Sequence, residues 1–408
     1  MSLSDPARAV LESNDVDGSS TRPSPRLYPH QWLWDSCFIA VGYSHFNVSR
    51  AKREILSALG GQWENGMIPH IRFNPEVRDY FPSPGDWGVP DGKMTSGITQ
   101  PPMPAIAAWE IFRRDRDRSF LEKVHGSLCS YHEYLHSERG GEVLFIVHPW
   151  ESGMDNSPIF DSALQRIEVD DTLEYLRMDR DLVDEAQRPV KEHYDRYMQL
   201  LKTFQEFEYD IGDIRRNSDF IFEDVLFNSI WSRANQDLAR ICREVGEDGA
   251  EYSEWCERTN EEMARREFRC YDAKSEEYVE KLSCAAIMPL YADAVEKDDL
   301  AGVLSSIDAL TLEHPICSYG PGQPEFDPSC YWRGPVWVNI NWFLIRGLLD
   351  YGLNDLAREI TGKTLKMIGE NGFREYYNPL SGEGYGGDRF SWTAALCIDI
   401  EKSMVNGI

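Results

Sequence analysis

The sequence of 408 residues predicts an all-α fold in a single domain. In about twelve segments, apolar residues recur at spacings of three and four, which places them on one face of a helix. Runs that alternate apolar and polar residues are scarce, and 143–147 is the best candidate for a strand. No low-complexity linker divides the chain. No exact repeat stands out, which argues against a solenoid but is compatible with a closed toroid of divergent helix pairs.

The predicted elements follow a polar segment that contains several prolines. Residues 1–27 are therefore expected to be an irregular lead-in, and 28–408 to form the domain. Asn47 precedes a periodic apolar segment and is a candidate N-cap, because its side chain can accept a hydrogen bond from a free backbone N–H. The helices are expected at about 34–46, 48–60, 102–114, 117–138, 189–208, 218–245, 248–268, 282–295, 298–309, 335–352, 354–370 and 391–403.

The connections at 61–101, 139–188, 310–334 and 371–390 are long and irregular. Loops of more than about 12–15 residues in a compact domain are usually functional or disordered. These four are dense in Trp, Tyr, Gly and acidic residues, which indicates function. We expect 61–101 and 139–188 to form a lid over a pocket.

Charge and composition restrict the class of protein. The chain has 42 Lys and Arg against 69 Asp and Glu, a net charge of −27, so it repels phosphate backbones and nucleic acid is not expected as a partner. No apolar run of about 18 residues predicts a membrane span, and the start of the chain does not resemble a secretory signal. The nine cysteines are scattered, without a Cys-x-x-Cys pair. We therefore expect a cytoplasmic protein with reduced thiols and without a cysteine zinc site.

The first candidate site cluster is 28–35, in which three aromatic residues accompany a carboxylate. Asp35 stands at the start of a predicted helix, where the helix dipole also favours a negative charge. The alternative interpretation is a helix cap with aromatic core packing. Gln100, at the end of a long loop, is placed to hydrogen-bond a ligand.

The second cluster, 148–158, places Glu151 and Asp155 on either side of a Ser-Gly turn beside Trp150. A carboxyl group against an aromatic wall has a raised pKa, because its charged form is poorly solvated, and a general acid needs such a pKa. Either carboxylate could instead hold the loop, and a structural turn network is the alternative.

Two further clusters lie in the last third of the chain. In 330–337, Arg333 stands among aromatic residues before a predicted helix start at Pro335 and could bridge carboxylates or stack on a ring. In 372–392, Glu375 precedes a Gly-rich loop, which allows the backbone to approach a ligand closely. Structural packing is again the alternative for both.

Other catalytic chemistries lack their motifs. The sequence has no His-Glu-x-x-His, Gly-x-Ser-x-Gly or Walker pattern, so neither a metal nor a cofactor is expected. Carboxylates among aromatic residues remain. This combination is typical of glycosidases, in which one carboxylic acid protonates the leaving oxygen and a second carboxylate activates water or attacks the sugar.

The clusters together resemble glycoside hydrolase family 63, in particular its mannosylglycerate and glucosylglycerate hydrolases. The resemblance extends from about Tyr28 to the C-terminus and depends on 31–35, 61–63, 148–157, 331–337 and 373–376. It implies an (α/α)6 toroid and an inverting mechanism, with Asp155 as general acid and Glu375 as general base. The Glu-Ser-Gly-x-Asp and Tyr-Trp-Arg-Gly-Pro patterns also resemble family 37 trehalases, so they define the catalytic class better than the substrate.

The same resemblance assigns the remaining site residues. Tyr80 and Trp87 are expected on the lid. Arg188 and Tyr331 are candidates to meet a glycerate carboxylate, because arginine offers two parallel donors; the alternative for Arg188 is an ordinary surface residue. The sugar site is expected to contain Tyr28, Trp32, Trp34, Asp35, Gln100, Trp150, Trp332 and Trp337. The chain has no room for the extra β-domain of large family members, which favours a small glycoside as substrate.

Three alternatives remain open at the level of sequence. The first is a trehalase-like or general α-glucosidase. The second is a sugar epimerase or isomerase on the same toroid, although such enzymes use His pairs and the clusters here centre on carboxylates. The third is a non-catalytic sugar-binding module. The sequence does not indicate an oligomeric state.

Overall fold

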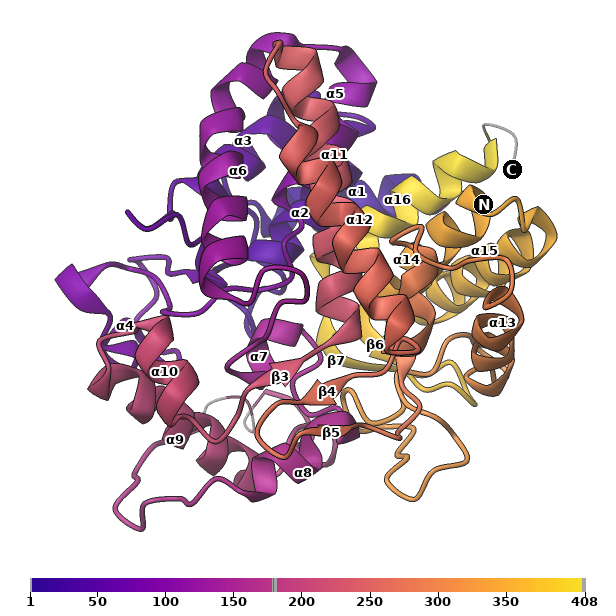
Figure 1. Ribbon diagram of the computed structural model, residues 1–408. Helices are drawn as coiled ribbons and strands as arrows, with labels where there is room; N and C mark the ends of the chain where they lie inside the picture. Colours follow the sequence, from indigo (N-terminus) through magenta and orange to yellow (C-terminus); the bar gives the residue numbers. More distant parts are fainter. Residues whose placement is uncertain (1, 178, 180–181, 406–408) are drawn as a thin grey trace.

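The computed structural model describes all residues except 1, 178, 180–181 and 406–408, and it is mostly helical (Figure 1). At its centre, six helical elements each pack against the next and close a ring within the described residues. These inner elements are α2 (Leu33–Ser44), α5 (Pro104–Asp115), α11 (Val225–Val245), the 3-10 helix η5 (Cys284–Leu290), α14 (Val338–Asp350) and α16 (Ser391–Val405).

A second layer of helices covers the ring from outside. In chain order, outer and inner elements alternate, so the described residues form six outer–inner pairs and the predicted (α/α)6 toroid is confirmed. The outer helices are α1 (Ser4–Asn14), α3 (Val48–Leu59), α6 (Arg118–Glu138), α12 (Ala250–Arg265), α13 (Leu300–Ala309) and α15 (Asn354–Asn371).

Burial explains which helices form which layer. Every residue of α2 is buried, as expected of a helix with neighbours on all sides. The outer helix α3 buries one face instead, with Ala51, Ile55 and Leu59 spaced by four residues. The Asn47 side chain accepts a hydrogen bond from Arg50 N at 3.1 Å, which confirms the predicted cap. None of the helices in the described part of the chain is long and apolar enough to cross a membrane.

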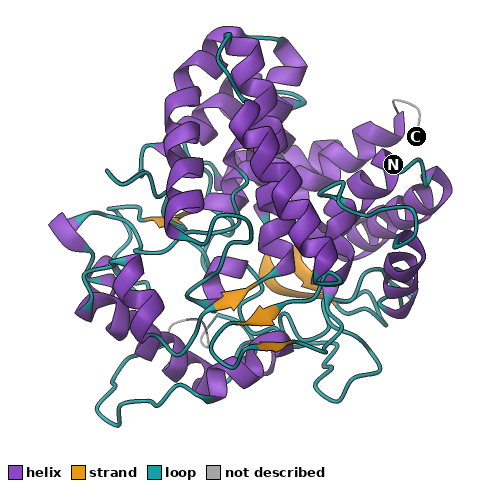
Figure 2. Cartoon of the chain, viewed as in Figure 1, coloured by secondary structure: helices purple, strands orange, loops and turns teal. Residues whose placement is uncertain are grey.

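Short elements fill the loops at one end of the ring, in the lower half of the view in Figure 2. Three small antiparallel sheets stand there: β1 (Gln31–Trp32) with β2 (Ile71–Arg72), β3 (Phe222–Glu223) with β4 (Tyr271–Asp272) and β5 (Glu277–Tyr278), and the hairpin of β6 (Arg374–Tyr377) and β7 (Gly384–Asp388). The helices among these loops are α4 (Pro84–Trp87), α7 (Pro149–Ser152), α8 (Asp161–Gln165), α9 (Lys191–Glu206) and α10 (Ile211–Asn217).

The prediction of an irregular lead-in over 1–27 is wrong for α1. Ala7 and Leu11 are fully buried, and the helix packs against α16 near the other end of the chain. The Asn14 side chain donates to the Arg389 carbonyl at 2.8 Å. Tertiary packing thus stabilises a helix whose own sequence is largely polar.

Three further expectations need correction. The segment 282–295 contains the short 3-10 helix η5 instead of an α-helix, because Pro289 inside it cannot donate a backbone hydrogen bond. The candidate strand 143–147 forms only an isolated bridge between Ile146 and Phe222. The helix expected from Pro335 begins at Val338, because Val336 is extended and pairs with two other segments.

A buried ion cluster links the inner helices. Asp399 of α16 is 1% exposed and accepts hydrogen bonds from Arg346 and Trp342 of α14, each at 2.8 Å. It also pairs with His45, which follows α2, and with Arg114 of α5. Burial raises the pKa of Asp399, but Arg346 and the hydrogen bonds from His45 and Trp342 outweigh it and hold this pKa well below its ordinary value.

We predict that Asp399→Asn lowers the free energy of unfolding by about 3–5 kcal/mol at pH 7, because it removes the carboxylate shared by Arg346, Arg114 and His45 and leaves Arg346 with Glu110 as its remaining ion-pair partner. A depressed carboxyl pKa stabilises the fold above the unfolded pKa of about 3.9, and this contribution is lost as the pH falls below it. The deficit should therefore shrink in acid. Thermal melts from pH 7 down to pH 4 and below test this, with the exposed Asp355→Asn as control. Equal melting temperatures for the two variants would contradict the prediction.

Candidate active site

A pocket opens at the loop-bearing end of the ring. Its walls come from segments far apart in sequence, including the start of α2, the loop after α7, the loop before α9 and the β6–β7 hairpin. The lining residues are Pro23, Tyr28, Trp32, Trp34, Asp35, His70, Ile71, Tyr80, Phe81, Pro82, Gln100, Trp150, Gly153, Asp155, Arg188, Tyr194, Tyr331, Trp332, Glu375, Phe390 and Trp392.

Glu375 reaches the pocket from β6. Its Oε1 accepts a hydrogen bond from the Tyr28 hydroxyl at 2.7 Å, and its Oε2 accepts one from Gly387 N at 2.7 Å. Burial raises the pKa of Glu375, whereas Arg188 and these two donors oppose the rise by favouring the carboxylate. Gly386 is required beside it: its φ is +63°, and a Cβ there would clash with the Glu375 carboxylate.

Asp155 reaches the pocket from the turn that follows α7. Gly153, at φ +76°, ends this helix against the Trp34 ring, and the Tyr197 hydroxyl donates to the Asp155 carbonyl at 2.8 Å. Burial raises the pKa of the Asp155 carboxyl to about 7, although Arg188 lowers it, and the charge of Glu375 contributes to the rise. A carboxyl group with this pKa is still partly protonated at neutral pH.

The two carboxylates of the 148–158 cluster have different positions. Glu151 is fully buried and does not line the pocket; its oxygens accept hydrogen bonds from both terminal nitrogens of Arg139, at 2.9 and 2.8 Å. It also accepts one from Val147 N at 2.8 Å. Glu151 therefore holds the loop in place, and Asp155 is the member of this pair that faces the pocket.

Arg188 reaches the pocket from the segment before α9 and lies beside Glu375. Its Nη1 donates to the Tyr28 hydroxyl at 2.8 Å and lies 3.7 Å from Glu375 Oε1. Its Nε donates to Asp179 at 3.1 Å, and its guanidinium stacks 4.4 Å from the centre of the Tyr331 ring. Among the described lining residues it is the only arginine or lysine.

The aromatic residues form most of the remaining wall. Of the predicted sugar-site residues, all but Trp337 line the pocket, and Gln100 also accepts a hydrogen bond from Trp34 N at 3.3 Å. Trp337 is fully buried behind Trp332, on which it stacks with 3.9 Å between ring centres. Trp87, expected on the lid, is likewise fully buried, against Trp150 and His70. Trp337 is therefore corrected from the wall to a supporting layer, whereas Trp87 lies in the predicted lid loop 61–101 with its side chain buried.

Several lining residues were missed by sequence reasoning. His70 and Phe81 lie inside the predicted lid loop 61–101, so the position of that loop could have indicated that they line the pocket. Tyr194 lies on α9 within an ordinary amphipathic helix pattern, so nothing local distinguishes it from a core residue. Trp392, at the start of α16, ends the 372–392 cluster, so that cluster was a usable signal for it. Arg333 forms a two-pronged ion pair with Asp161 outside the pocket, as one sequence interpretation expected.

The combination of a helical toroid with several buried carboxyl groups in one aromatic pocket is characteristic of glycoside hydrolases. Comparison with known proteins assigns the chain to one family of them. The sequence profile of the "Mannosylglycerate hydrolase MGH1-like glycoside hydrolase domain" matches residues 28–393, and the chain belongs to this family. The resemblance to glycoside hydrolase family 63 is thereby confirmed.

Three similar proteins cover nearly the whole chain. A mannosylglycerate hydrolase of Rubrobacter radiotolerans is 39% identical over 97% of this chain and 95% of its own length. A glucosylglycerate hydrolase of Mycolicibacterium hassiacum is 35% identical over 96% of each. The crystal structure of the family 63 mannosylglycerate hydrolase from Thermus thermophilus, in complex with Tris and D-glycerate, is 40% identical, covers 97% of this chain and 99% of its own, and has a TM-score of 0.92.

Proposed function

We propose that this glycoside hydrolase hydrolyses mannosylglycerate or glucosylglycerate with inversion of the anomeric centre. The observation that carries the proposal is the pairing of Asp155 and Glu375 in one pocket, beside a single arginine. The two carboxyl groups have different surroundings, as an acid–base pair requires. The names of the similar proteins support the substrate class.

In the proposed mechanism, Asp155 is the general acid. Its pKa of about 7 keeps a proton available at neutral pH for the glycosidic oxygen, so the leaving group departs as an alcohol. Glu375 is the general base. Its oxygens are oriented by Tyr28 and Gly387, and it removes a proton from a water that attacks the anomeric carbon from the opposite face.

The sugar is proposed to bind among the aromatic rings and polar groups of the wall. Trp34 and Trp332 present ring faces with 6.4 Å between their centres, and Asp35 and Gln100 offer hydrogen-bonding groups nearby. Burial and the charge of Glu375 raise the pKa of Asp35 well above its ordinary value. A protonated Asp35 donates to a sugar hydroxyl without adding a further negative charge beside Glu375.

Arg188 and Tyr331 are proposed to receive the glycerate carboxylate. Glu375 must be ionised to act as the base, so an anionic substrate needs a local cation to approach it. Arg188 is held in place by Asp179, which in turn is paired with Arg177 at 2.6 Å. Tyr331 lies under its guanidinium and contacts the Tyr28 hydroxyl at 3.2 Å, which places both residues beside the catalytic base.

Assays distinguish the proposed activity from other functions that the same toroid could have. A trehalase-like or general α-glucosidase would prefer trehalose or neutral gluco-oligosaccharides. An epimerase or isomerase would use His pairs, but His70 is the one histidine among the described lining residues. A binding module would hold sugar without turnover. Side-by-side assays with both glycerate glycosides, trehalose and kojibiose distinguish these alternatives.

We predict that Asp155→Asn and Glu375→Gln each lower kcat about 10²–10⁴-fold, the typical contribution of general acid–base catalysis. Neither change should lower the melting temperature appreciably, because each removes a charge that burial disfavours. Steady-state kinetics on mannosylglycerate and glucosylglycerate measure the effect. Glu383→Gln, exposed at the turn of the β6–β7 hairpin, is the control and should retain wild-type activity. Wild-type kcat in either active-site variant would refute the assignment.

We further predict that Arg188→Gln discriminates between charged and neutral substrates. Loss of a hydrogen bond to a charged group costs about 1.5–3 kcal/mol, so kcat/KM for mannosylglycerate should fall about 10–100-fold more than kcat/KM for uncharged mannosylglycerol. The difference between substrates isolates the carboxylate contact from any effect on Glu375. Lys191→Gln, an exposed cation near the same segment, is the control. An equal loss for both substrates would assign Arg188 to Glu375 alone.

A further inference from the structure

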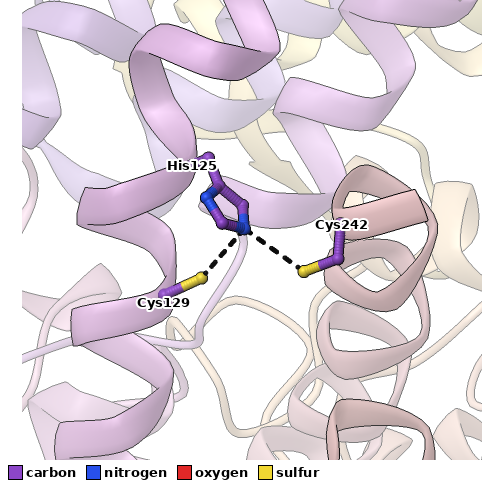
Figure 3. Close-up of side chains that lie close together, drawn as sticks. All are labelled: His125, Cys129 and Cys242. Atoms are coloured by element: carbon purple, nitrogen blue, oxygen red, sulfur yellow. Dashed lines mark hydrogen bonds between the residues drawn. The ribbon is translucent and has the colours of Figure 1, made fainter. Parts of the chain in front are cut away.

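Three side chains of the kinds that bind metal ions lie close together between an outer and an inner helix, away from the pocket. His125 and Cys129 lie one turn apart on the same face of α6, and Cys242 faces them from α11 (Figure 3). None of the three lines the pocket. No local pattern in the sequence indicates this cluster, because it joins an i, i+4 pair to a cysteine more than one hundred residues later.

The distances within this cluster fit a metal ion. His125 Nε2 lies 3.3 Å from Cys242 Sγ and 3.3 Å from Cys129 Sγ, and all three atoms lie within 4.8 Å of one another. In tetrahedral zinc sites, Zn–S bonds of about 2.3 Å and Zn–N bonds of about 2.0–2.1 Å place ligand nitrogen and sulfur about 3.5 Å apart. Side-chain shifts of a few tenths of an ångström would therefore admit an ion at the centre.

Hydrogen bonding alone satisfies this arrangement poorly. The Nε2 atom of a neutral imidazole either donates one proton or accepts one, whereas here two thiols approach the same atom. Thiols are also weak donors and weak acceptors. Thiolate is the form of cysteine that binds metals.

We propose that His125, Cys129 and Cys242 bind a thiophilic metal ion, with Zn²⁺ as the expected occupant, which joins α6 to α11. Imidazole and thiolate ligands suit zinc, while hard cations such as Mg²⁺ prefer oxygen. As the two Zn–S bonds form, both thiols release their protons to solvent, and His125 binds through its Nε2 lone pair while Nδ1 keeps its proton. His125 and Cys129 are partly exposed, which leaves a side open for entry and for a water as fourth ligand. The role is structural and independent of the proposed hydrolysis.

Metal content of the reduced, full-length protein tests the proposal. After equilibration with ZnCl₂ and removal of free metal by gel filtration, we expect one zinc per chain, with close to two protons released per zinc bound. Substitution by Co²⁺ should give thiolate-to-metal charge-transfer bands. These readouts use the wild-type protein, so they do not depend on the folding of any variant.

Matched cysteine variants assign the ligands. Cys129→Ser and Cys242→Ser should lose the bound zinc and the Co²⁺ bands while they keep wild-type hydrolytic activity. Cys256→Ser, which removes a buried thiol of α12 that contacts Ser232 outside the cluster, should retain both. Absence of zinc from the wild-type protein would overturn the proposal, as would equal zinc retention in all three variants.

Discussion

The contact of Arg188 with Tyr28 and Glu375 is the interaction on which the active site depends. It joins the segment before α2, the segment before α9 and the β6–β7 hairpin. Arg188 lies 160 residues after Tyr28 in the sequence, and Glu375 lies 347 residues after it. Electrostatically, Arg188 supplies a positive charge beside the Glu375 carboxyl group. Arg188 favours the ionised form of Glu375 and opposes the raised pKa of Asp155, so one cation acts on both proposed catalytic groups.

The toroid positions Arg188, Tyr28 and Glu375 because the loops and short strands that carry them lie at one end of the ring. The inner helices bury their side chains in the core, and the pocket residues come from helix starts and from the loops that connect the pairs. A supporting layer fixes the wall from behind. Trp337 stacks on Trp332, Trp87 packs on Trp150, and the Glu151–Arg139 pair holds the loop that carries Asp155. Rigid packing of this kind keeps catalytic groups within the small tolerance that catalysis allows.

The sequence was informative where a local pattern determines the structure. Amphipathic spacing located most helices of the ring, and the clusters of carboxylates and aromatic residues identified the pocket segments. Prediction from the sequence failed where a structural feature depends on a contact between residues far apart in the chain. The helix α1 depends on packing against α16, and Glu151 is distinguished from Asp155 by Arg139 beyond its own motif. Trp332 and Trp337 are tryptophans of the same sequence cluster, so the sequence does not distinguish them. Only the stacked geometry shows that Trp332 faces the pocket.

The central claim is that Asp155 and Glu375 hydrolyse a glycerate glycoside by single displacement. Proton NMR of the sugar released from mannosylglycerate and from glucosylglycerate, recorded before mutarotation, tests it most directly. An inverting enzyme acting on an α-glycoside releases the β-anomer first, because water attacks the face opposite the leaving group. We expect the β-anomer signal to appear first for whichever glycoside is hydrolysed. Initial release of the α-anomer, or failure to hydrolyse either glycoside, would contradict the account.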